Sequence, residues 1–335
     1  MPEVSNNAGN PDYPGTLRAI AARLLAHEGP IYLAAHVDPD GDALGSVLGL
    51  SRALRQVGKD SRPVVDCPKY LNFLPERGEL HPPVEVLPED SLLVALDSGD
   101  APRVTGVPVA QPGIPVINID HHGTNSRYGE IHLVEPGKAA ASVIVHDLIP
   151  YLGAEWTPLL ATPVLTGMIT DTGSFRFPNT TPDVLRAAAD LVGHGAPLAE
   201  INDYIATTPR PFFRLQAEVL NTVEFPFDGL MVTAFVNDAV LERSGTTWED
   251  TESLVGIIRA AEGTQLAVLI KDRGPVTKLS LRSRGLVSAQ AIAVECGGGG
   301  HVAAAGATVN RPFKETVELL MAATEREFHR CGLLP

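Results

Sequence analysis

Several short segments of the sequence carry side chains that can bind metal ions or transfer protons. The first is the loop HVDPDGD, in which His36, Asp40 and Asp42 follow a short apolar run. Nitrogen and oxygen ligands this close together can hold a divalent cation. The same residues also fit a polar turn in which Asp42 caps a helix, because aspartate is favoured at helix N-termini. An EF-hand does not fit, since Ala43 and Gly49 stand where that loop needs glycine and glutamate.

Three further segments place acids or histidines where apolar runs end. Asp97 follows SLLVAL, and Asp171 lies among hydroxyl side chains in TGMITDTGSF. Each fits a metal ligand, but each also fits a turn held by its own carboxylate. Asp120-His121-His122 is a stronger signal, because three titratable groups crowded at a strand end cost desolvation and repulsion unless something binds them. Imidazoles bound to Mn, Fe, Co or Zn, with Asp120 fixing the ring tautomer, would remove that cost.

A glycine run suggests a phosphate site. Gly297-Gly-Gly-Gly300-His301 precedes VAAAGA, and we expect the glycines to open a helix of small residues. Backbone N–H groups at the positive end of that helix would suit a phosphate, although a flexible turn is the alternative. The run SLRSR places Arg282 and Arg284 on one strand face, where a guanidinium can contact phosphate in bidentate fashion. The sequence contains no GxxxxGK[ST] and no GxSxG, and no GxGxxG follows the first strand.

The elements that position these segments can be read from the apolar runs. Short apolar strands are expected at Ile31 to Ala35, Ser61 to Asp66, Ser91 to Asp97 and Pro115 to Asp120. They alternate with helices expected at Leu17 to His27, Ala43 to Val57, Ala140 to Leu152 and Pro158 to Thr170. This alternation predicts an α/β fold with a mainly parallel sheet flanked by helices. Ligands bind at the carboxyl ends of such strands, where His36, Asp97 and Asp120 fall.

The length of 335 residues fits about two domains. We predict a mobile tail over 1–14, a larger domain over 15–185, a helical linker over 186–225 and a smaller α/β domain over 226–335. The smaller domain is expected to contain strands at Leu230 to Val236, Gln265 to Lys271 and Thr277 to Arg282, and helices at Thr251 to Ala261, Ser288 to Val294 and Phe313 to Phe328.

The amino-acid composition limits the kinds of binding partner and the cellular location that we expect. The net charge of −14, from 40 acids against 26 bases, disfavours binding to long duplex nucleic acid. No apolar run approaches the roughly 18 residues of a membrane span, and the first residues lack a secretory signal. Three isolated cysteines argue against a disulfide framework, so a cytoplasmic protein without membrane contact is expected.

Taken together, HVDPDGDALGS, ALDSGD, NIDHHGTN, TGMITDTGSFRF, SLRS and GGGGHVAAAGA resemble the motifs of the DHH phosphoesterase superfamily in order and spacing. The chain looks specifically like the bacterial nanoRNase/pAp-phosphatase subfamily, from about Leu17 to Phe328. The resemblance implies that 15–185 form the DHH catalytic domain and that 226–335 form the DHH-associated substrate-binding domain with its GGGH motif.

This resemblance implies a two-metal centre that usually contains Mn²⁺, with Mg²⁺, Co²⁺ or Fe²⁺ as further possibilities. The family pattern assigns one ion to His36 and Asp40, the other to Asp42, His121 and Asp171, with Asp97 bridging them. Two ions about 3.5 to 4 Å apart stabilise the attacking and leaving oxygens of an in-line displacement.

The same resemblance assigns roles around the metals. His122 would face the substrate phosphate as a charge stabiliser or proton donor, and Asp120 would orient the histidines. The substrate's terminal phosphate or nucleotide would be bound by Ser280, Arg282, Gly298, Gly299, Gly300 and His301. One position departs from the pattern: many relatives carry an acid at about Val143, which is apolar here.

The implied activity is manganese-dependent hydrolysis of short oligonucleotides (nanoRNA) and linear dinucleotides such as pApA, with a 3′-phosphatase activity on pAp. A RecJ-like single-strand exonuclease would need a further nucleic-acid-binding domain. A DHH-type inorganic pyrophosphatase lacks GGGH in its second domain. A cyclic-dinucleotide phosphodiesterase and an idle nucleotide-sensing regulator are two more candidate functions. Relatives are often dimers, so a homodimer is a further expectation.

Overall fold

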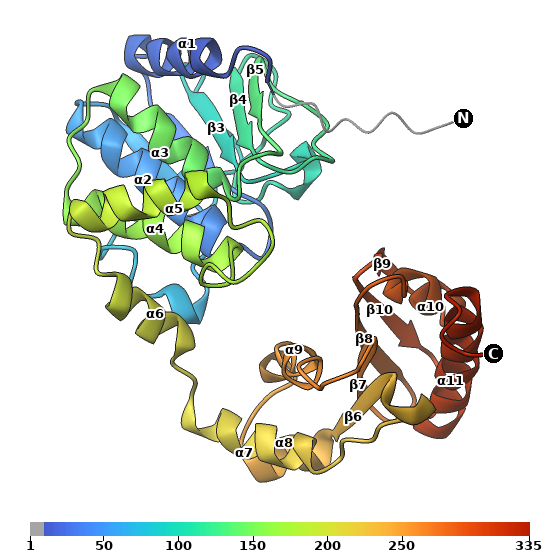
Figure 1. Ribbon diagram of the computed structural model, residues 1–335. Helices are drawn as coiled ribbons and strands as arrows, with labels where there is room; N and C mark the ends of the chain where they lie inside the picture. Colours follow the sequence, from blue (N-terminus) through green and yellow to red (C-terminus); the bar gives the residue numbers. More distant parts are fainter. Residues whose placement is uncertain (1–9) are drawn as a thin grey trace, which may run out of the picture. The chain divides into compact units, whose positions relative to one another are not determined.

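The computed structural model describes residues 10–335, and the chain divides into two compact units, Met1–Thr207 and Thr208–Pro335 (Figure 1). Residues 1–9 of the predicted tail lie outside the described residues. The tail is shorter than predicted, because a helix already begins at Tyr13. The Asp12 side chain accepts a hydrogen bond from Gly15 N, and Pro14 fits the first helical turn, so these residues start the helix.

The first unit contains, in chain order, α1 (Tyr13–Ala26), β1 (Ile31–Ala34), α2 (Gly41–Gln56), β2 (Ser61–Val64), η1 (Lys69–Leu71), β3 (Leu92–Leu96), η2 (Ala101–Arg103), β4 (Val116–Asp120), β5 (Ile131–Val134), α3 (Ala141–Leu152), α4 (Pro158–Asp171), α5 (Pro182–Gly193) and α6 (Leu198–Ala206). Its five strands form an entirely parallel sheet in the order β2-β1-β3-β4-β5. The predicted parallel α/β fold is therefore confirmed, and the carboxyl ends of β1, β3 and β4 are neighbours at one edge.

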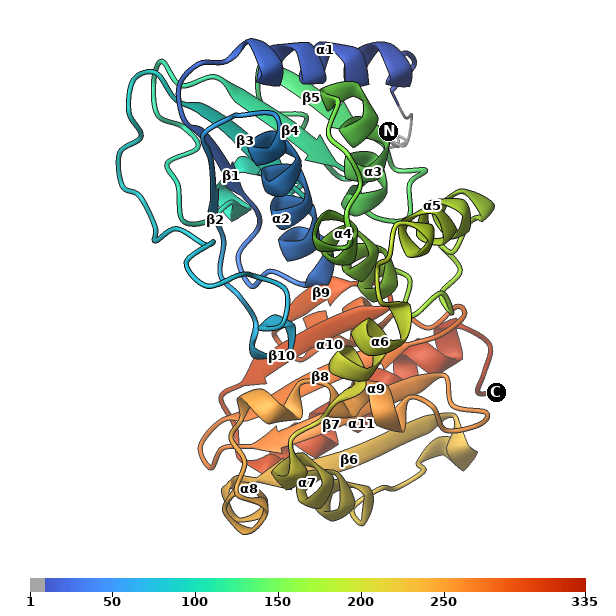
Figure 2. The same cartoon turned by 90° about the vertical axis from the view of Figure 1, so that its left-hand side faces the viewer.

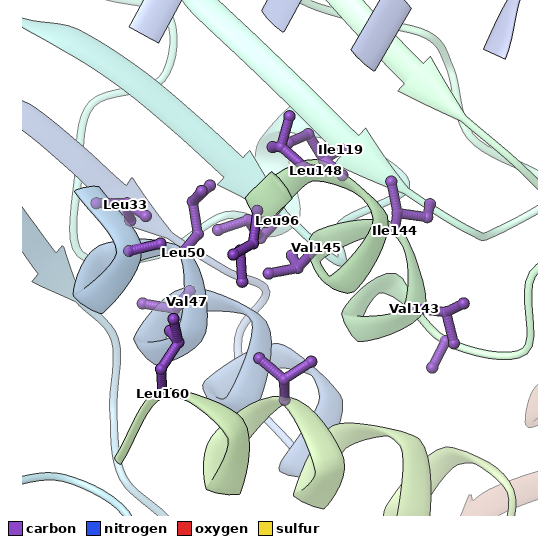
Figure 3. Close-up of a cluster of buried hydrophobic side chains, with 14 of the residues drawn as sticks. Leu33, Val47, Leu50, Leu96, Ile119, Val143, Ile144, Val145, Leu148 and Leu160 are labelled. Atoms are coloured by element: carbon purple, nitrogen blue, oxygen red, sulfur yellow. The ribbon is translucent and has the colours of Figure 1, made fainter. Parts of the chain in front are cut away.

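Helices and irregular segments cover opposite faces of this sheet. On one face, apolar side chains of α1 to α4 pack against alternate residues of the strands, and α2 lies beside α3 (Figures 1 and 2). Figure 3 shows the centre of this core, where Leu33 and Leu96 from the strands lie together with Leu50 of α2 and Leu148 of α3. The other face is covered by the segments around Leu87, Val104 and Ile114. The sequence predicts only the helical layer.

The contact between α2 and α4 is unusually close, because glycines line it. Gly41, Gly45 and Gly49 recur every fourth residue along α2, which places them on one helix face. A Cβ atom at Gly45 would overlap the Pro163 carbonyl oxygen of α4, and one at Gly41 would overlap the Thr170 side chain. The two helix backbones therefore touch directly where Gly45 of α2 meets Pro163 of α4, and Gly41 makes room for the Thr170 side chain.

The second unit contains α7 (Arg210–Leu220), η3 (Phe227–Gly229), β6 (Met231–Asn237), α8 (Asp238–Ser244), η4 (Glu249–Thr251), α9 (Leu254–Ile258), β7 (Leu266–Asp272), β8 (Thr277–Ser283), α10 (Ala289–Glu295), β9 (Gly299–His301), β10 (Ala304–Val309) and α11 (Phe313–Arg330). Its mixed sheet has the order β6-β7-β8-β10-β9. Side chains of α10 and α11 cover one face, and side chains of α7, α8 and α9 pack on β6 and β7 of the other.

The prediction of a helix after the glycine run is wrong. Residues 299–301 and 304–309 instead form the antiparallel strands β9 and β10. A run of alanine and glycine has no alternating apolar pattern that would indicate a strand. The high helix propensity of alanine therefore favoured a helix. Gly298 and Gly300 are required by close packing: a Cβ atom at Gly298 would overlap the Gly306 carbonyl oxygen, and one at Gly300 would lie 2.7 Å from the Ala304 carbonyl oxygen.

The predicted linker over 186–225 is divided between the units. Most of α5 falls in that range, and α5 packs against α3 and α4 of the first unit through Val184, Ala187 and Leu191. The division of the chain lies between Thr207 and Thr208, after α6 and before α7. Over residues 10–335, no helix combines the length and the apolar character needed to cross a lipid bilayer.

Candidate metal centre

The ends of three neighbouring strands supply half of the six candidate ligands. His36 follows β1, Asp97 follows β3, and Asp120 ends β4 just before His121 and His122. Asp97 has a left-handed backbone with φ of 50°, a conformation that aspartate tolerates better than most residues. This backbone turn places Asp97 at the junction of the other side chains, 3.5 Å from His36 Nε2 through Oδ2 and 3.4 Å from His121 Nε2 through Oδ1.

The N-terminus of α2 supplies two more carboxylates. Asp40, not Asp42, is the N-cap, because its Oδ1 accepts hydrogen bonds from Asp42 N at 2.9 Å and Ala43 N at 3.1 Å. Asp42 lies inside the helix and is fully buried. Its carboxylate accepts hydrogen bonds from the first two amides of α3, Ala141 N at 2.6 Å and Ser142 N at 2.9 Å. Asp42 is therefore not the helix cap, whereas Asp40 is both the cap and a candidate metal ligand.

The last carboxylate comes from the C-terminus of α4. Asp171 Oδ2 lies 3.3 Å from His121 Nε2, and Asp42 Oδ2 lies 3.8 Å from the same nitrogen. Three groups of possible ligand atoms result among the described residues, and within each group all atoms lie within 4.8 Å of one another. Two of them match the expected ligand groups, His36 with Asp40 and Asp97, and Asp42 with His121 and Asp171, and the third joins Asp97 and His121 to His122. The structure thus brings together all six side chains singled out as ligands.

The chemistry of this cluster fits divalent metal ions. Four carboxylates and two imidazoles offer the oxygen and nitrogen ligands that Mn, Fe and Co accept. Asp97 Oδ1 is buried and has no hydrogen-bond partner within residues 10–335. A buried carboxylate oxygen without a partner is costly, and a cation would satisfy it. Asp97 lies next to both groups, as a bridging ligand requires.

Proton affinities in the cluster are strongly perturbed. Burial and the charge of Asp42 raise the pKa of Asp171 to about 9, and burial with the charge of Asp97 raises that of Asp42 to about 7. Burial lowers the pKa of His121, but Asp97 and Asp42 outweigh it and raise the pKa to about 10. Asp97 likewise raises the pKa of His36 to about 9. Burial opposes ionisation of Asp97, but His121 and His36 outweigh burial and lower its pKa.

Because metal ligands must be deprotonated, these raised pKa values predict that metal binding releases protons. Apparent affinity should therefore rise with pH between about 6 and 9, by about tenfold per pH unit for each proton released. Calorimetric titration of Mn²⁺ at pH 7.5, in two buffers with different ionisation enthalpies, measures this release. Equal heats in both buffers would show that the ligands are already deprotonated.

His122 is held by a network that sequence analysis missed in part. Its Nδ1 lies 2.7 Å from Asp120 Oδ1, while Asp120 Oδ2 accepts a 2.6 Å hydrogen bond from Asn125 Nδ2. Asn125 Nδ2 also donates to Asn118 Oδ1 at 2.9 Å. Asp120 and both asparagines are buried, whereas the His122 side chain is 40% exposed. In the sequence, Asn125 follows HHGT and resembles an ordinary turn residue. Its role in holding Asp120 becomes visible only in the structure, where it also contacts Asn118 of β4.

Val143 belongs to α3 and is buried in the apolar core of the first unit (Figure 3). A carboxylate at this position would be buried among apolar side chains, so the apolar residue suits its surroundings here. The ligand groups do not include this position.

Four of the six predicted phosphate-binding residues fall in two register rows on one side of the second unit's sheet: Ser280, Arg282, Gly299 and His301. Gly300 falls in the row of Ala305 and Leu281, which faces the other side, and Gly298 precedes β9. Arg282 of β8 pairs with Ala304 of β10, and Ala304 pairs with His301 of β9. Ser280 lies on the same side of β8 as Arg282, with Gly306 and Gly299 in its register row. These backbone register rows, which hold mainly serine, glycine and alanine beside Arg282, are here called the glycine floor (Ser280, Arg282, Gly299, His301, Ala304 and Gly306).

Two expectations about this surface need correction. The glycines do not begin a helix, so the glycine floor lacks the helix-end amides proposed from sequence. Arg284 lies beyond the end of β8 and does not share the strand face of Arg282. Its Nη2 donates a 2.7 Å hydrogen bond to the Arg259 carbonyl instead.

Solved structures share this fold. An exopolyphosphatase-related protein from Bacteroides fragilis superposes with a TM-score of 0.82, covering 93% of this chain and 96% of that one at 23% identity. RecJ from Thermus thermophilus, in complex with Mn²⁺, matches with a TM-score of 0.54 and 17% identity, covering 98% of this chain and 56% of RecJ. At these identities the likeness concerns the fold alone.

Sequence comparisons reach further. The bifunctional oligoribonuclease and PAP phosphatase NrnA of Thermus thermophilus is 52% identical over 333 residues, 99% of this chain and 100% of that protein. Its namesake in Bacillus subtilis is 28% identical over 83% of this chain and 89% of that protein. The family model described as the DHH family, N-terminal domain, matches 30–168, and the DHHA1 domain model matches 230–330. The chain therefore belongs to the DHH family, and its second unit carries a DHHA1 domain.

Proposed function

We propose that the chain hydrolyses short oligonucleotides and linear dinucleotides such as pApA to mononucleotides and removes the 3′-phosphate of pAp. The observation that carries this proposal is the pair of ligand groups that meet at Asp97, at the carboxyl edge of a parallel sheet. The likeness to proteins named oligoribonuclease and PAP phosphatase supports the choice of substrate.

We further propose that the two ligand groups hold Mn²⁺, since their mixed imidazole and carboxylate ligands suit that ion. When bound, two such ions supply positive charge to the reacting phosphate and lower the pKa of water. The protein's part is to fix the ligands. Asp42 is held by two main-chain amides of α3, and Asp40 by two amides of α2. Neither carboxylate can turn away without breaking these hydrogen bonds.

His122 is proposed to stabilise or protonate the substrate. With Nδ1 hydrogen-bonded to Asp120, its Nε2 remains to hold a proton at the solvent-exposed side of the cluster. The hydrogen bond to Asp120 raises the pKa of His122, which favours the protonated ring. A protonated ring can donate to a phosphate oxygen or to the departing oxygen.

The Asp120→Asn variant tests this role. Without the carboxylate, the pKa of His122 should fall toward its ordinary value. If the reaction needs protonated His122, the alkaline fall in kcat/KM should move to lower pH, and the maximum should drop by about 10 to 100-fold. The pH profile on pApA measures both effects. An unchanged alkaline limb would show that His122 does not supply a proton.

The substrate assignment needs a direct assay. The protein with Mn²⁺ is incubated with 5′-labelled di- to pentaribonucleotides, pAp, pyrophosphate, a cyclic dinucleotide and a 24-mer. Mononucleotides should appear fastest from the shortest RNAs, and pAp should lose its 3′-phosphate. Preference for the cyclic dinucleotide, pyrophosphate or the 24-mer would instead favour the corresponding enzyme class. No product from any substrate would favour a nucleotide-sensing protein. A cytoplasmic location and a homodimer stay predictions.

A further inference from the structure

Three arginines gather at one end of the second unit's sheet, here called the arginine cluster (Arg259, Arg282 and Arg284). Arg259 directly follows α9 as its C-cap, Arg282 is the last residue but one of β8, and Arg284 directly follows β8. Of the three, only Arg282 is among the substrate-binding residues expected from the sequence. Arg259 lies on another element, well before β8 in the chain, and its position gave no sequence signal.

Hydrogen bonds fix Arg259 against the end of β8. Its Nη2 donates to the Ser283 carbonyl at 3.2 Å, and its own carbonyl accepts a 2.7 Å hydrogen bond from Arg284 Nη2. Arg259 Nε is buried and has no hydrogen-bond partner among the described residues. A guanidinium presents several donors in one plane, so a fixed arginine with an unsatisfied donor is prepared to bind an acceptor.

The electrostatic surroundings of Arg259 also favour the binding of an anion. Burial and the charges of Arg284 and Arg282 lower its pKa, and both of these charged neighbours are cationic. Like charges gathered together repel one another, and an anion that binds between them removes the repulsion. Arg282 Nη1 donates to the Leu281 carbonyl at 3.0 Å, so its remaining donors are not committed by that bond.

The surroundings of the cluster suit a phosphorylated ligand. Helix α9 packs on β6, β7 and β8, so Arg259 at its end borders the glycine floor. The apolar cluster under α9 contains side chains of β6 and β7, but none of the glycine floor among the described residues. Arg282 lies on the glycine floor and Arg259 stands at its border.

We propose that Arg259 is a specificity-determining residue that binds the 5′-phosphate of the substrate, beside the phosphate contact of Arg282. This inference rests on the proposed function. Both pAp and pApA carry an adenosine with a phosphate on each side, and only the phosphate on the 3′ side is cleaved in the proposed reaction. The guanidinium of Arg259 binds the 5′-phosphate, which is not cleaved, and this contact makes the enzyme prefer 5′-phosphorylated substrates.

The Arg259→Gln variant separates this role from the reaction itself. With Mn²⁺ present, kcat/KM for pApA should fall about tenfold or more, the worth of a charge-assisted hydrogen bond. For ApA, which lacks the 5′-phosphate, kcat/KM should change by less than about twofold, so the preference for pApA collapses. Arg259→Lys should retain part of the preference, because it keeps the charge but loses the fork. Arg311→Gln removes an exposed arginine of the same unit and serves as the matched control.

Equal losses on pApA and ApA, or no loss on either, would overturn the proposal. A binding measurement keeps it testable if the wild-type protein hydrolyses neither substrate, which would refute the proposed function alone. Calorimetry of the full chain without metal should then show that 5′-AMP binds the wild type more tightly than adenosine does. Arg259→Gln should remove that difference. If AMP and adenosine bind the wild type alike, Arg259 holds no phosphate.

Discussion

Replacing Asp97 with asparagine is expected to reduce turnover of pApA by at least about a thousandfold, because both ligand groups meet at this carboxylate. The amide keeps the size of the side chain and, like aspartate, tolerates the left-handed backbone with φ of 50° at this position. It cannot supply negative charge to two cations. Calorimetric titration of Mn²⁺ should show that fewer ions bind and that they bind more weakly.

Asp100→Asn is the matched control for this variant. Asp100 is exposed, lies three residues later in the same segment, and makes no side-chain capping bond to η2. Its replacement should leave kcat/KM within about twofold of the wild type, as surface substitutions usually do. Activity of Asp97→Asn within about tenfold of the wild type, with a normal thermal unfolding curve, would remove Asp97 from the metal centre.

Replacing Asp171 with asparagine is expected to separate stability from activity. Metal binding and turnover should fall by about a hundredfold or more, because one ligand group loses its third member. The metal-free protein should become more stable near neutral pH. Asp171 has a pKa of about 9 in the folded chain, so folding near neutral pH requires this half-buried carboxylate either to take up a proton or to stay charged beside Asp42.

The sign of the pH dependence follows from the raised pKa. Unfolded aspartate titrates near about 3.9, so between that pH and about 9 the folded state binds more protons than the unfolded state. The contribution of Asp171 to wild-type stability is therefore fully present at low pH and is lost as pH rises through about 9. The asparagine variant lacks this loss.

Thermal unfolding of the metal-free proteins at several pH values measures the difference. The gain in Tm should be near zero at about pH 4 and largest at about pH 8 to 9, at about 2 to 4 °C per kcal/mol relieved. Mn²⁺ should then raise the Tm of the wild type more than that of the variant. Asp203→Asn, at an exposed position on α6, is the control. A variant that is less stable at every pH would contradict the raised pKa of Asp171.

The metal centre could be located from sequence because its residues end elements. Acids and histidines directly after apolar runs predict the carboxyl edge of a parallel sheet, and three of the strands carrying them proved to be neighbours. Asp171 could be included only through the resemblance to a family, since a carboxylate among hydroxyl residues is ambiguous. The sequence also left open whether Asp42 was a cap or a ligand. The hydrogen bonds of Asp40 show that Asp40, not Asp42, is the cap.

The sequence could not predict segments that lack an apolar periodicity, nor roles that depend on contacts between distant elements. The glycine run contains no alternation that would distinguish a hairpin from a helix, and only pairing with β8 defines it. Strand β5 is too short and too exposed at its start to be recognised. Asn125 and Arg259 act through residues distant in the chain, so their roles depend on tertiary contacts.

The contact of α2 with α4 governs how the metal centre can respond to different ions. Asp42 and Asp171 lie on these two helices. The helices touch main chain to main chain at Gly45 and Pro163, while Gly41 and Gly49 face the side chains of Thr170 and Val164. We expect this close packing to resist a wider separation of the two carboxylates. Ca²⁺ takes ligands at about 2.3 to 2.6 Å and Mg²⁺ at about 2.0 to 2.1 Å. A helix contact whose glycines bind no metal themselves is therefore expected to influence which ionic radius the centre accepts.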